Sequence, residues 1–504
     1  MSRADRIALL FSLLAALASY LVSDLVFEQM AHIEDEMAYV WQAEAIVRGH
    51  LTIPSPPEEK SFLVPFVVDY NGLRFGKYPL GWPVFLALGL FLGIRSLVNP
   101  LLAGLGVWLI YRLGKLAFGE IVALLAAGLT LTSPFFLLNS GSLLSHPFGL
   151  VLSAAFALTW LDAFGNPAAP RRWLPVLVAA FSLGVLALTR PLSAVAVAAP
   201  FSLHGLYLLV RGDWLVRRRV LLLGGLVLAL ASIHFLWQYA VTGNPSLNPY
   251  ILWWDYDRVG FGVGVGRGPQ GHSLEQAYAN ARYSLRSGAR DLFGWGAYSW
   301  IFLPFGLLAL GRNWRGWLSG SVFLSLVIFY LAYWIGAALF GPRYYYEGLY
   351  SLTLLSASGI AFLAGWPVRP GAMREPATSW MRLRPYLVSA VLLSLIIYNL
   401  TVYLPPRLGE MVGLYGVERS RLQPFLAPQA QQYTPALVIV HPEEKWTEYG
   451  SLLELQDPFL TTPFIFVHTR GPEVDAEVAS HYRDRKIYHY YPEEPYRFYT
   501  TPRP

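Results

Sequence analysis

The sequence predicts a polytopic, mainly α-helical membrane protein. Only 14% of its 504 residues are charged and 55% are hydrophobic, whereas soluble globular proteins are nearer one quarter charged. Apolar runs long enough to cross a bilayer recur along the chain, and short basic clusters separate them. The net charge of +6 therefore indicates membrane topology and argues against a nucleic-acid partner. The absence of cysteine excludes disulfides and thiolate chemistry.

Apolar runs of about 17–25 residues, the length that a helix needs to cross a bilayer, predict about eleven spans. They fall at residues 7–27, 97–117, 119–138, 147–164, 173–190, 191–210, 220–241, 297–311, 317–340, 344–365 and 385–404. The first run has no clean small-residue cleavage site and leads into an acidic segment. We therefore expect a retained helix there and no cleaved signal.

The short run 80–94 decides the predicted topology. If it lies along the membrane interface, nearly every compact basic cluster falls on one side, as the positive-inside rule requires. These clusters are Arg3 with Arg6, Arg112 with Lys115, Arg171 with Arg172, Arg211 with Arg217–219, Arg312 with Arg315, and Arg369 with Arg374, Arg382 and Arg384. We therefore expect a protein of the prokaryotic plasma membrane with a cytoplasmic N-terminus and an extracytoplasmic C-terminus.

This topology leaves three long segments outside the cytoplasm. They are a first loop at 28–79, a second at 242–296 and the tail 405–504. The second loop departs from the charge bias, because it carries Arg258, Arg267, Arg282, Arg286 and Arg290. The tail is charged, with short apolar runs at 436–440 and 464–467 that favour strands. We predict a transmembrane domain over 1–404 and a small α/β domain over 405–504.

The first outer loop opens with an acidic segment that is typical of a helix. Apolar residues from Met37 to Val47 approximate one face, which predicts an amphipathic helix on the bilayer surface. Glu34, Asp35 and Glu36 stand at its start. Carboxylates in this position can complement the positive end of the helix dipole, or can supply a general base or a cation site. The two interpretations have about equal support.

Basic side chains near the outer boundary are candidates for binding an anion. Lys77 precedes a proline turn, where its ammonium would pair with a phosphate or simply snorkel, and the spacing alone favours snorkelling. Arg190 and Arg343 lie at outer ends of spans, against the charge bias. Because a charge at membrane depth usually faces a polar cavity, both are functional candidates. Glu347 is a candidate partner of Arg343 or a second polar group of the cavity.

Other polar residues carry weaker signals. Tyr345 belongs to a run of three tyrosines that fits either an aromatic belt or substrate binding. His146 is a substrate-binding candidate or a helix cap. Asp255, Asp257 and His272 flank a glycine-rich stretch that suits a substrate loop or a plain mobile loop. Since no strand precedes the glycines and the Walker pattern is absent, a nucleotide site is not supported.

The chemistry of bound ions stays open at this stage. A divalent ion between carboxylates such as Asp35 and Asp255 is conceivable, but no residue pattern fixes a metal or any other cofactor. The chain has no HExxH motif, zinc-cysteine cluster or Ser-His-Asp pattern, so a hydrolase has no support.

Four motifs in order resemble the GT-C superfamily of membrane glycosyltransferases. After the first helix comes EDEMAYVWQAEAIVRG, then a Lys-Pro-type turn into FGKYPLGWPVFLALGLFLG, a span ending in RLG, and GPRYYYEG before a late helix. The bacterial branch related to protein O-mannosyltransferases and aminoarabinose transferases is the most similar. The resemblance covers residues 1–404, and we expect the tail to lie outside the shared core.

The resemblance implies an enzyme that moves a sugar from a polyprenyl-phosphate donor to an acceptor hydroxyl outside the cytoplasm, with inversion at the anomeric carbon. By position, Asp35 matches the catalytic base and Glu36 is its neighbour, while Glu34 keeps the choice of base open. Lys77 matches the residue that meets the donor phosphate, although Tyr78-Pro79 stands where relatives usually have Pro-Pro. Arg343 is the implied second phosphate partner, followed by Arg190 and His146. The acceptor, whether lipid, glycan or protein, is not identified.

Two other functions compete with this one. A transporter or lipid flippase would use the acidic loop as a gate and predicts charged or broken helices near the bilayer midplane, where the sequence has few charges. A non-catalytic membrane scaffold that presents the tail would leave Arg190 and Arg343 unexplained.

Overall fold

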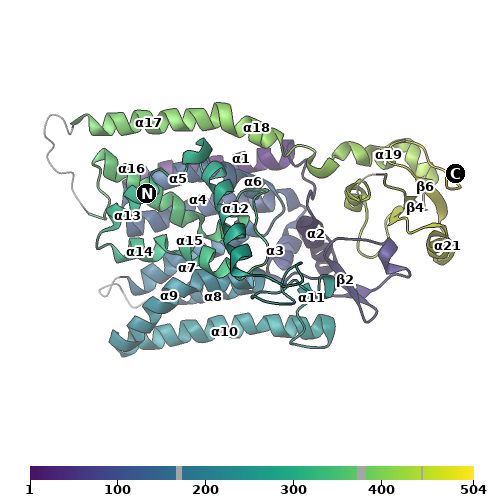
Figure 1. The fold of residues 1–504 in the computed structure, drawn as a ribbon, viewed down its shortest axis with the longest axis horizontal. Coiled ribbons are helices and arrows are strands. Elements are labelled where there is room, and N and C mark those ends of the chain that lie inside the picture. The colour runs from purple at the N-terminus through teal and green to yellow at the C-terminus, as the bar shows by residue number, and fades with distance from the viewer. Residues whose placement is uncertain (166–172, 372–381, 444–445, 504) are drawn as a thin grey trace.

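A bundle of long helices makes up most of the protein in the computed structural model, which describes residues 1–165, 173–371, 382–443 and 446–503 (Figure 1). Within these residues, seven helices are long and apolar enough to cross a membrane. They are α1 (Arg3–Leu25), Arg95–Ala117 with α4 (Val98–Ala117), α7 (His146–Phe164), α9 (Pro191–Arg211), α10 (Trp214–Thr242), Arg343–Ala364 with α16 (Leu349–Ala364), and Arg384–Leu426 with α17 (Arg384–Tyr398). The protein is therefore an integral membrane protein with mainly helical architecture. Of the basic residues used to predict topology, Arg171, Arg172 and Arg374 lie outside the described residues.

Several of the eleven predicted spans are shorter or broken: by length and composition, the described part of the chain has seven candidate spans, or nine if each bent pair counts as one span. The helices α5 (Glu120–Leu131) and α6 (Pro134–Gly141) meet at 58°. Proline cannot donate a helical hydrogen bond, and the Ser133 hydroxyl caps the new helix by accepting from the Phe136 N–H. The sequence around residue 133 therefore ends one helix and starts another.

The remaining helices of the bundle are shorter or more polar. They are α8 (Leu174–Thr189), α13 (Leu303–Leu310), α14 (Trp314–Gly320), α15 (Val322–Tyr330) and the polar helix α12 (Leu274–Asp291). The predicted span 317–340 is divided between α14, α15 and irregular chain after Tyr330. A bend of 108° separates α12 from the segment 296–310. This irregular backbone borders the cavity described below.

The exposed surfaces of the outermost helices suit a bilayer. The most hydrophobic windows of the spans that include α10 and α17 are only 11% buried, and these helices lie on opposite edges of the bundle in Figure 1. Their exposed side chains include Leu228, Phe235, Leu387 and Val391. Apolar surface of this extent is stable against lipid and costly against water.

The first loop forms a compact layer at one end of the bundle. It contains α2 (Glu34–Val47), a three-stranded antiparallel sheet and α3 (Gly81–Phe91). The strands β1 (Ile53–Pro54), β2 (Val67–Tyr70) and β3 (Leu73–Gly76) pair in the order β1-β3-β2. At 11 residues, α3 is about 16 Å long, which is too short to cross a bilayer, as predicted for the run 80–94.

The prediction that α2 lies on the bilayer surface is wrong. Almost all of its central residues are buried, including Glu36 and Gln42, because α3 and the C-terminal segment pack around it. The Gln42 amide donates to the Tyr78 carbonyl oxygen at 2.8 Å. A helix enclosed in this way holds its first-turn carboxylates in fixed positions.

The C-terminal segment contains the predicted small α/β fold. Its parallel strands β4 (Ala436–Val440), β5 (Phe464–His468) and β6 (Lys486–Tyr490) pair in the order β5-β4-β6. The helix α21 (Pro472–His481) connects β5 to β6. Shorter helices α18 (Leu404–Gly409), α19 (Gln423–Leu426) and α20 (Thr447–Gly450) complete this part of the chain. Figure 1 shows the segment beside α2 at the same end of the bundle.

Candidate functional site

A cavity of about 360 Å³ opens where the start of α2 meets the ends of the membrane helices. Its volume lies within the range typical of small-molecule sites, about 300–1,000 Å³. Aromatic side chains dominate its lining. They are Tyr39, Phe66, Tyr78, Tyr250, Trp254, Tyr330, Tyr333, Trp334 and Tyr344. Seven Asp, Glu, Lys and Arg side chains and one histidine, His234, also line it. The seven are Glu34, Asp35, Lys77, Arg190, Asp257, Arg267 and Arg343.

Asp35 lies on the first turn of α2 with its carboxylate partly exposed to the cavity. The Tyr78 hydroxyl donates to Oδ1 at 2.6 Å. The Arg343 guanidinium lies 3.5 Å from Oδ2, as an ion pair whose two side chains are 16% and 25% exposed. Tyr78 follows Lys77 in the turn before α3, so the Tyr-Pro pair that departs from Pro-Pro supplies a group that orients this carboxylate.

Lys77 and Asp257 form a buried ion pair in the wall of the same cavity. Lys77 Nζ lies 3.0 Å from Asp257 Oδ2 and 3.7 Å from the centre of the Phe66 ring. The Tyr333 hydroxyl and the Trp334 indole N–H donate to Asp257 Oδ1 at 3.1 and 3.0 Å. Burial lowers the pKa of Lys77, and the charge of Asp257 opposes that shift. Lys77 is therefore a fixed, enclosed group and does not snorkel.

Arg190 closes another side of the cavity at the start of α9. Its Nε lies 2.6 Å from Glu347 Oε1, and its Nη2 donates to the Tyr330 hydroxyl at 3.2 Å. Glu347 is completely buried on the short helix before α16. The prediction that Glu347 is the partner of Arg343 is therefore wrong, because Arg190 and Arg343 each bind a different carboxylate.

Glu36 does not face the cavity. Its carboxylate accepts the backbone N–H groups of His32 and Ile33 at 2.8 and 3.1 Å, and that of Leu143 at 2.6 Å. Burial raises the pKa of Glu36 to about 7, while these hydrogen bonds oppose the shift. Glu36 therefore caps α2 and fastens it to the chain after α6, which corrects its assignment as a catalytic candidate.

Glu34 remains available in the cavity. Its side chain is half-buried and lines the cavity beside Asp35. Burial raises the pKa of Glu34, and the neighbouring charge of Asp35 raises it further. Of the three acidic residues, Glu34 and Asp35 thus keep a route to a substrate.

Four other substrate-binding candidates do not line the cavity. His146 is buried in the first turn of α7 against Tyr346, and Tyr345 packs on Phe323. Asp255 is exposed. His272 is buried and stacks on Phe261, with Nε2 2.8 Å from the Leu331 carbonyl oxygen. Neighbouring side chains and backbone enclose His146, Tyr345 and His272, whereas Asp255 faces solvent, so none of the four meets a substrate in this cavity.

Arg267 is a cavity residue that sequence patterns did not single out. Its guanidinium lies 5.3 Å from the Trp254 ring and 5.4 Å from the Trp334 ring. The surrounding loop has glycines with positive φ at 260, 262, 264 and 266, which allow tight turns that other residues disfavour. The glycine spacing was the available signal, but irregular loops have no period from which a side chain's direction can be predicted.

A second cavity, of about 420 Å³, lies on the other side of Asp35. Glu34, Asp35 and Arg343 line both cavities. The remaining lining comes from His32, Ile33, Leu339, Tyr415, Trp446 and Thr447, so the C-terminal segment contributes to it. The Asp35–Arg343 pair thus forms part of a wall that two cavities share.

The described residues contain no group of three or more His, Asp or Glu side chains placed to hold a metal ion. The pair Asp35 and Asp255 does not form such a group, because Asp255 is exposed and does not line either cavity. The Asp257 carboxylate is bound by Lys77, Tyr333 and Trp334.

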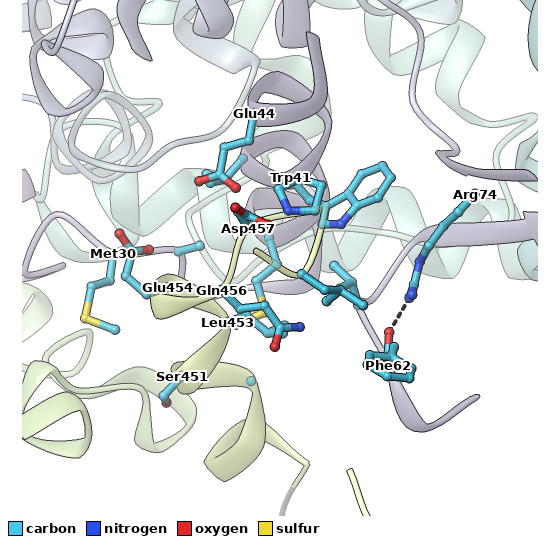
Figure 2. Close-up of a pocket in the computed structure, with 17 residues that line it drawn as sticks. Met30, Trp41, Glu44, Phe62, Arg74, Ser451, Leu453, Glu454, Gln456 and Asp457 are labelled. Carbon is cyan, nitrogen blue, oxygen red and sulfur yellow. Dashed lines mark hydrogen bonds between the residues drawn. The ribbon is translucent and has the colours of Figure 1, made fainter. Parts of the chain in front are cut away.

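A third cavity, between α2 and the C-terminal segment, is far smaller (Figure 2). Its volume is about 40 Å³. Figure 2 shows Glu44 and Asp457 turned toward each other near Trp41, and Arg74 donating to the Phe62 carbonyl oxygen. This volume is about a tenth of that of either cavity beside Asp35, so the site is better described as a packing contact between two parts of the chain.

Comparisons with known proteins identify the fold. The family model described as dolichyl-phosphate-mannose-protein mannosyltransferase matches residues 86–237. The crystal structure of ArnT from Cupriavidus metallidurans bound to undecaprenyl phosphate superposes with a TM-score of 0.59 at 16% identity, covering 95% of this chain and 89% of that one. The chain has the GT-C fold. Together the family match and the fold support a membrane glycosyltransferase of the GT-C type.

A more distant structure shares the same fold. AglB, an oligosaccharyltransferase from Archaeoglobus fulgidus in complex with an inhibitory peptide and a dolichol-phosphate, has a TM-score of 0.51 at 13% identity. The match covers 96% of this chain and 69% of AglB. No curated protein sequence matches the chain.

The extent of the ArnT match corrects one expectation about the tail. Residues 405–504 make up about a fifth of the chain, so a match over 95% of it must include most of them. The structural likeness therefore continues past residue 404, beyond the motifs that carry the resemblance in sequence.

Proposed function

We propose that this GT-C protein transfers a sugar from a polyprenyl-phosphate donor to an acceptor hydroxyl on the extracytoplasmic side of the membrane. The observation that carries the proposal is the position of Asp35, a carboxylate in the wall between two cavities with Arg343 beside it. A group-transfer enzyme needs a base that reaches the acceptor and cations that reach the leaving group. This arrangement supplies both at one point.

The aromatic cavity suits the donor headgroup. Arg267 and Arg343 present guanidinium groups to it, and Lys77 lies deeper in its wall. Guanidinium groups bind phosphate oxygens with two parallel N–H bonds. Structures that share the fold contain bound undecaprenyl phosphate or a dolichol-phosphate, which supports a polyprenyl phosphate as the lipid of the donor.

The reaction follows from the charges in this wall. Asp35 accepts the proton of the acceptor hydroxyl while the oxygen of that hydroxyl attacks the anomeric carbon of the donor sugar. The bond from that carbon to the phosphate oxygen breaks, and the electron pair leaves with the lipid phosphate. Arg343 and Lys77 stabilise the extra negative charge. A single displacement of this kind inverts the anomeric carbon, and the Tyr78 hydroxyl holds Asp35 in place during it.

The second cavity suits the acceptor. It reaches Asp35 from the side of the C-terminal segment, where Tyr415 and Trp446 provide aromatic surfaces. Tyr415 has φ of 59°, and the Thr447 hydroxyl donates to its carbonyl oxygen at 2.7 Å. Backbone held in this sparsely populated conformation is often found at functional sites. We infer that these side chains position the acceptor hydroxyl above Asp35.

The bent helix pair α5–α6 is also a feature that the transporter hypothesis predicted. However, residues 121–141 contain no ionisable side chain, whereas charged groups line the cavities at the end of the bundle. A polar pathway through the bend would lack the charged groups that such pathways use. The geometry therefore favours the enzyme.

The test is donor consumption by the purified full-length protein in nanodiscs. A panel of radiolabelled polyprenyl-phosphate sugars would be incubated with a membrane extract as the source of acceptor. We expect one donor to lose its label to an acceptor fraction, and the loss to depend on Asp35. Consumption of no donor, or equal consumption by the Asp35→Asn variant, would contradict the proposal.

A further inference from the structure

A stripe of arginines follows one face of α12. Arg282, Arg286 and Arg290 are spaced four residues apart, so they lie above one another on the helix, and all three are exposed. Tyr278 continues the stripe by one turn, and Tyr283 lies next to it; these tyrosines are 66% and 60% exposed. The stripe therefore combines three positive charges with amphipathic aromatic rings.

The opposite face of α12 is fixed to the protein. Ala277, Ala281, Ser284 and Gly288 are buried. The Asn280 amide donates to the Trp334 carbonyl oxygen at 2.9 Å, and the Ser284 hydroxyl accepts the Ala337 N–H at 3.0 Å. At the end of the helix, Asp291 pairs with Arg407 at 3.1 Å. These contacts prevent rotation, so the arginines must point away from the bundle.

The orientation of α12 places the stripe along the membrane surface. A bend of 108° separates α12 from the segment 296–310. In Figure 1 it runs across the bundle while α10 and α17 run along it, near the bundle end that carries α18. A helix with this orientation presents its exposed side chains at the level of lipid headgroups. Tyrosine is enriched at that level.

The three arginines stand apart from the ion pairs found in the described part of the chain. Among ion pairs between described residues, none involves Arg282, Arg286 or Arg290. Their positive charge is also an exception to the distribution of basic residues along the rest of the chain. Neither folding contacts nor the positive-inside rule accounts for it, which indicates an external anion.

We propose that this arginine stripe binds the phosphate groups of anionic phospholipids in the membrane leaflet that surrounds the cavities. The spacing of about 6 Å between successive arginines on a helix lets each guanidinium meet a separate headgroup. Each basic residue near an anionic membrane surface raises the affinity for that surface about fivefold. This lipid surface is separate from the two cavities and does not depend on the sugar-transfer reaction.

Lipid selection by the purified full-length protein tests the proposal. Nanodiscs would be assembled from phosphatidylcholine with one-fifth phosphatidylglycerol, and co-purifying lipids measured by native mass spectrometry after transfer to detergent. The variant Arg282→Gln/Arg286→Gln/Arg290→Gln removes the stripe. The control Arg470→Gln/Arg483→Gln/Arg497→Gln removes the same charge from exposed positions of the C-terminal segment.

We expect the wild type and the control to retain phosphatidylglycerol preferentially, and the stripe variant to lose about a hundredfold of that preference, since three basic residues each contribute about fivefold. Thermal unfolding in pure phosphatidylcholine should match among the three proteins, which separates lipid binding from misfolding. Retained preference in the stripe variant, or equal loss in the control, would overturn the proposal. So would inorganic phosphate that displaces phosphatidylglycerol at low millimolar concentration, since the ligand would then be free phosphate.

Discussion

The two ends of α2 face cavities with similar charges and different sizes. At its start, Glu34 and Asp35 border a cavity of about 360 Å³ lined by tyrosines and arginines. Three turns later, Glu44 borders a cavity of about 40 Å³ shared with Glu454 and Asp457. Beside this small cavity, Arg95 pairs with Glu454 and Arg48 pairs with Asp457.

The difference shows that acidic residues near arginines do not by themselves define a reaction site. Beside the small cavity, Arg95 and Arg48 are each committed to a carboxylate and Arg74 donates to a backbone carbonyl oxygen. The space itself is too small for a substrate. At the large cavity the Asp35–Arg343 distance is 3.5 Å, longer than a tight ion pair, and both groups face open volume. Room beside incompletely engaged charges distinguishes the proposed reaction site from the packing contact.

The strongest test of this comparison is Asp35→Asn. An amide cannot accept the acceptor's proton, so transfer should fall by about 10²- to 10⁴-fold, while donor binding stays within a few-fold. Transfer would be followed with the radiolabelled donor, and donor binding by equilibrium filtration. The matched control is Asp255→Asn, an exposed acid outside both cavities. A similar loss in the control would remove the special role of Asp35.

Lys77→Met tests the buried ion pair next to the site. It leaves Asp257 buried without its cation, which should destabilise the protein by about 3–5 kcal/mol. The free energy of unfolding in mild detergent measures this effect. Adding Asp257→Asn should restore most of the stability but not transfer. If the single variant is as stable as the wild type, the buried Lys77–Asp257 ion pair does not stabilise the fold.

Trp446→Ala tests whether the second cavity binds the acceptor. Loss of an aromatic contact worth about 0.5–1.5 kcal/mol should raise KM for the acceptor by about three- to tenfold and leave KM for the donor unchanged. Initial rates at varied acceptor and donor concentrations separate the two constants. The control Tyr386→Ala removes a ring that is 75% exposed on α17. An increase in donor KM instead would assign Trp446 to the other substrate.

Glu44→Gln tests the packing contact and has the smallest expected effect. Burial raises the pKa of Glu44 to about 8, and the charges of Glu454 and Asp457 add to the shift. The folded protein therefore holds a proton that the unfolded chain releases near pH 4–5, and wild-type stability should decline between pH 5 and pH 8. In the variant, this decline in Tm should be shallower, with transfer unchanged. An identical slope would place Glu44 in a more solvated environment.

Local patterns predicted the membrane fold and several cavity residues. The cavity lining includes five of the predicted residues, namely Asp35, Lys77, Asp257, Arg190 and Arg343. Charged side chains at the outer ends of apolar helices usually face a polar cavity, because exposure to lipid is costly. The break between α5 and α6 was also available locally, since Ser133-Pro134 is a strong helix start. The uninterrupted apolar run concealed it.

Long-range pairings could not be predicted in the same way. Glu36 and Asp35 are neighbours, but a rotation of about 100° per residue sends one toward Leu143 and the other toward the cavity. Glu347 lies four residues from Arg343 and yet pairs with Arg190, at the start of a different helix. Such choices depend on how distant helices pack, which no single window of sequence contains.

The wall that the two cavities share has a consequence for kinetics. Because Asp35 and Arg343 border both cavities, each substrate can reach the reacting atoms by its own route. Neither one then has to bind first, so initial-rate plots should intersect in the manner of a random-order ternary-complex mechanism. A parallel pattern would instead require a sugar held covalently on the enzyme between two half-reactions.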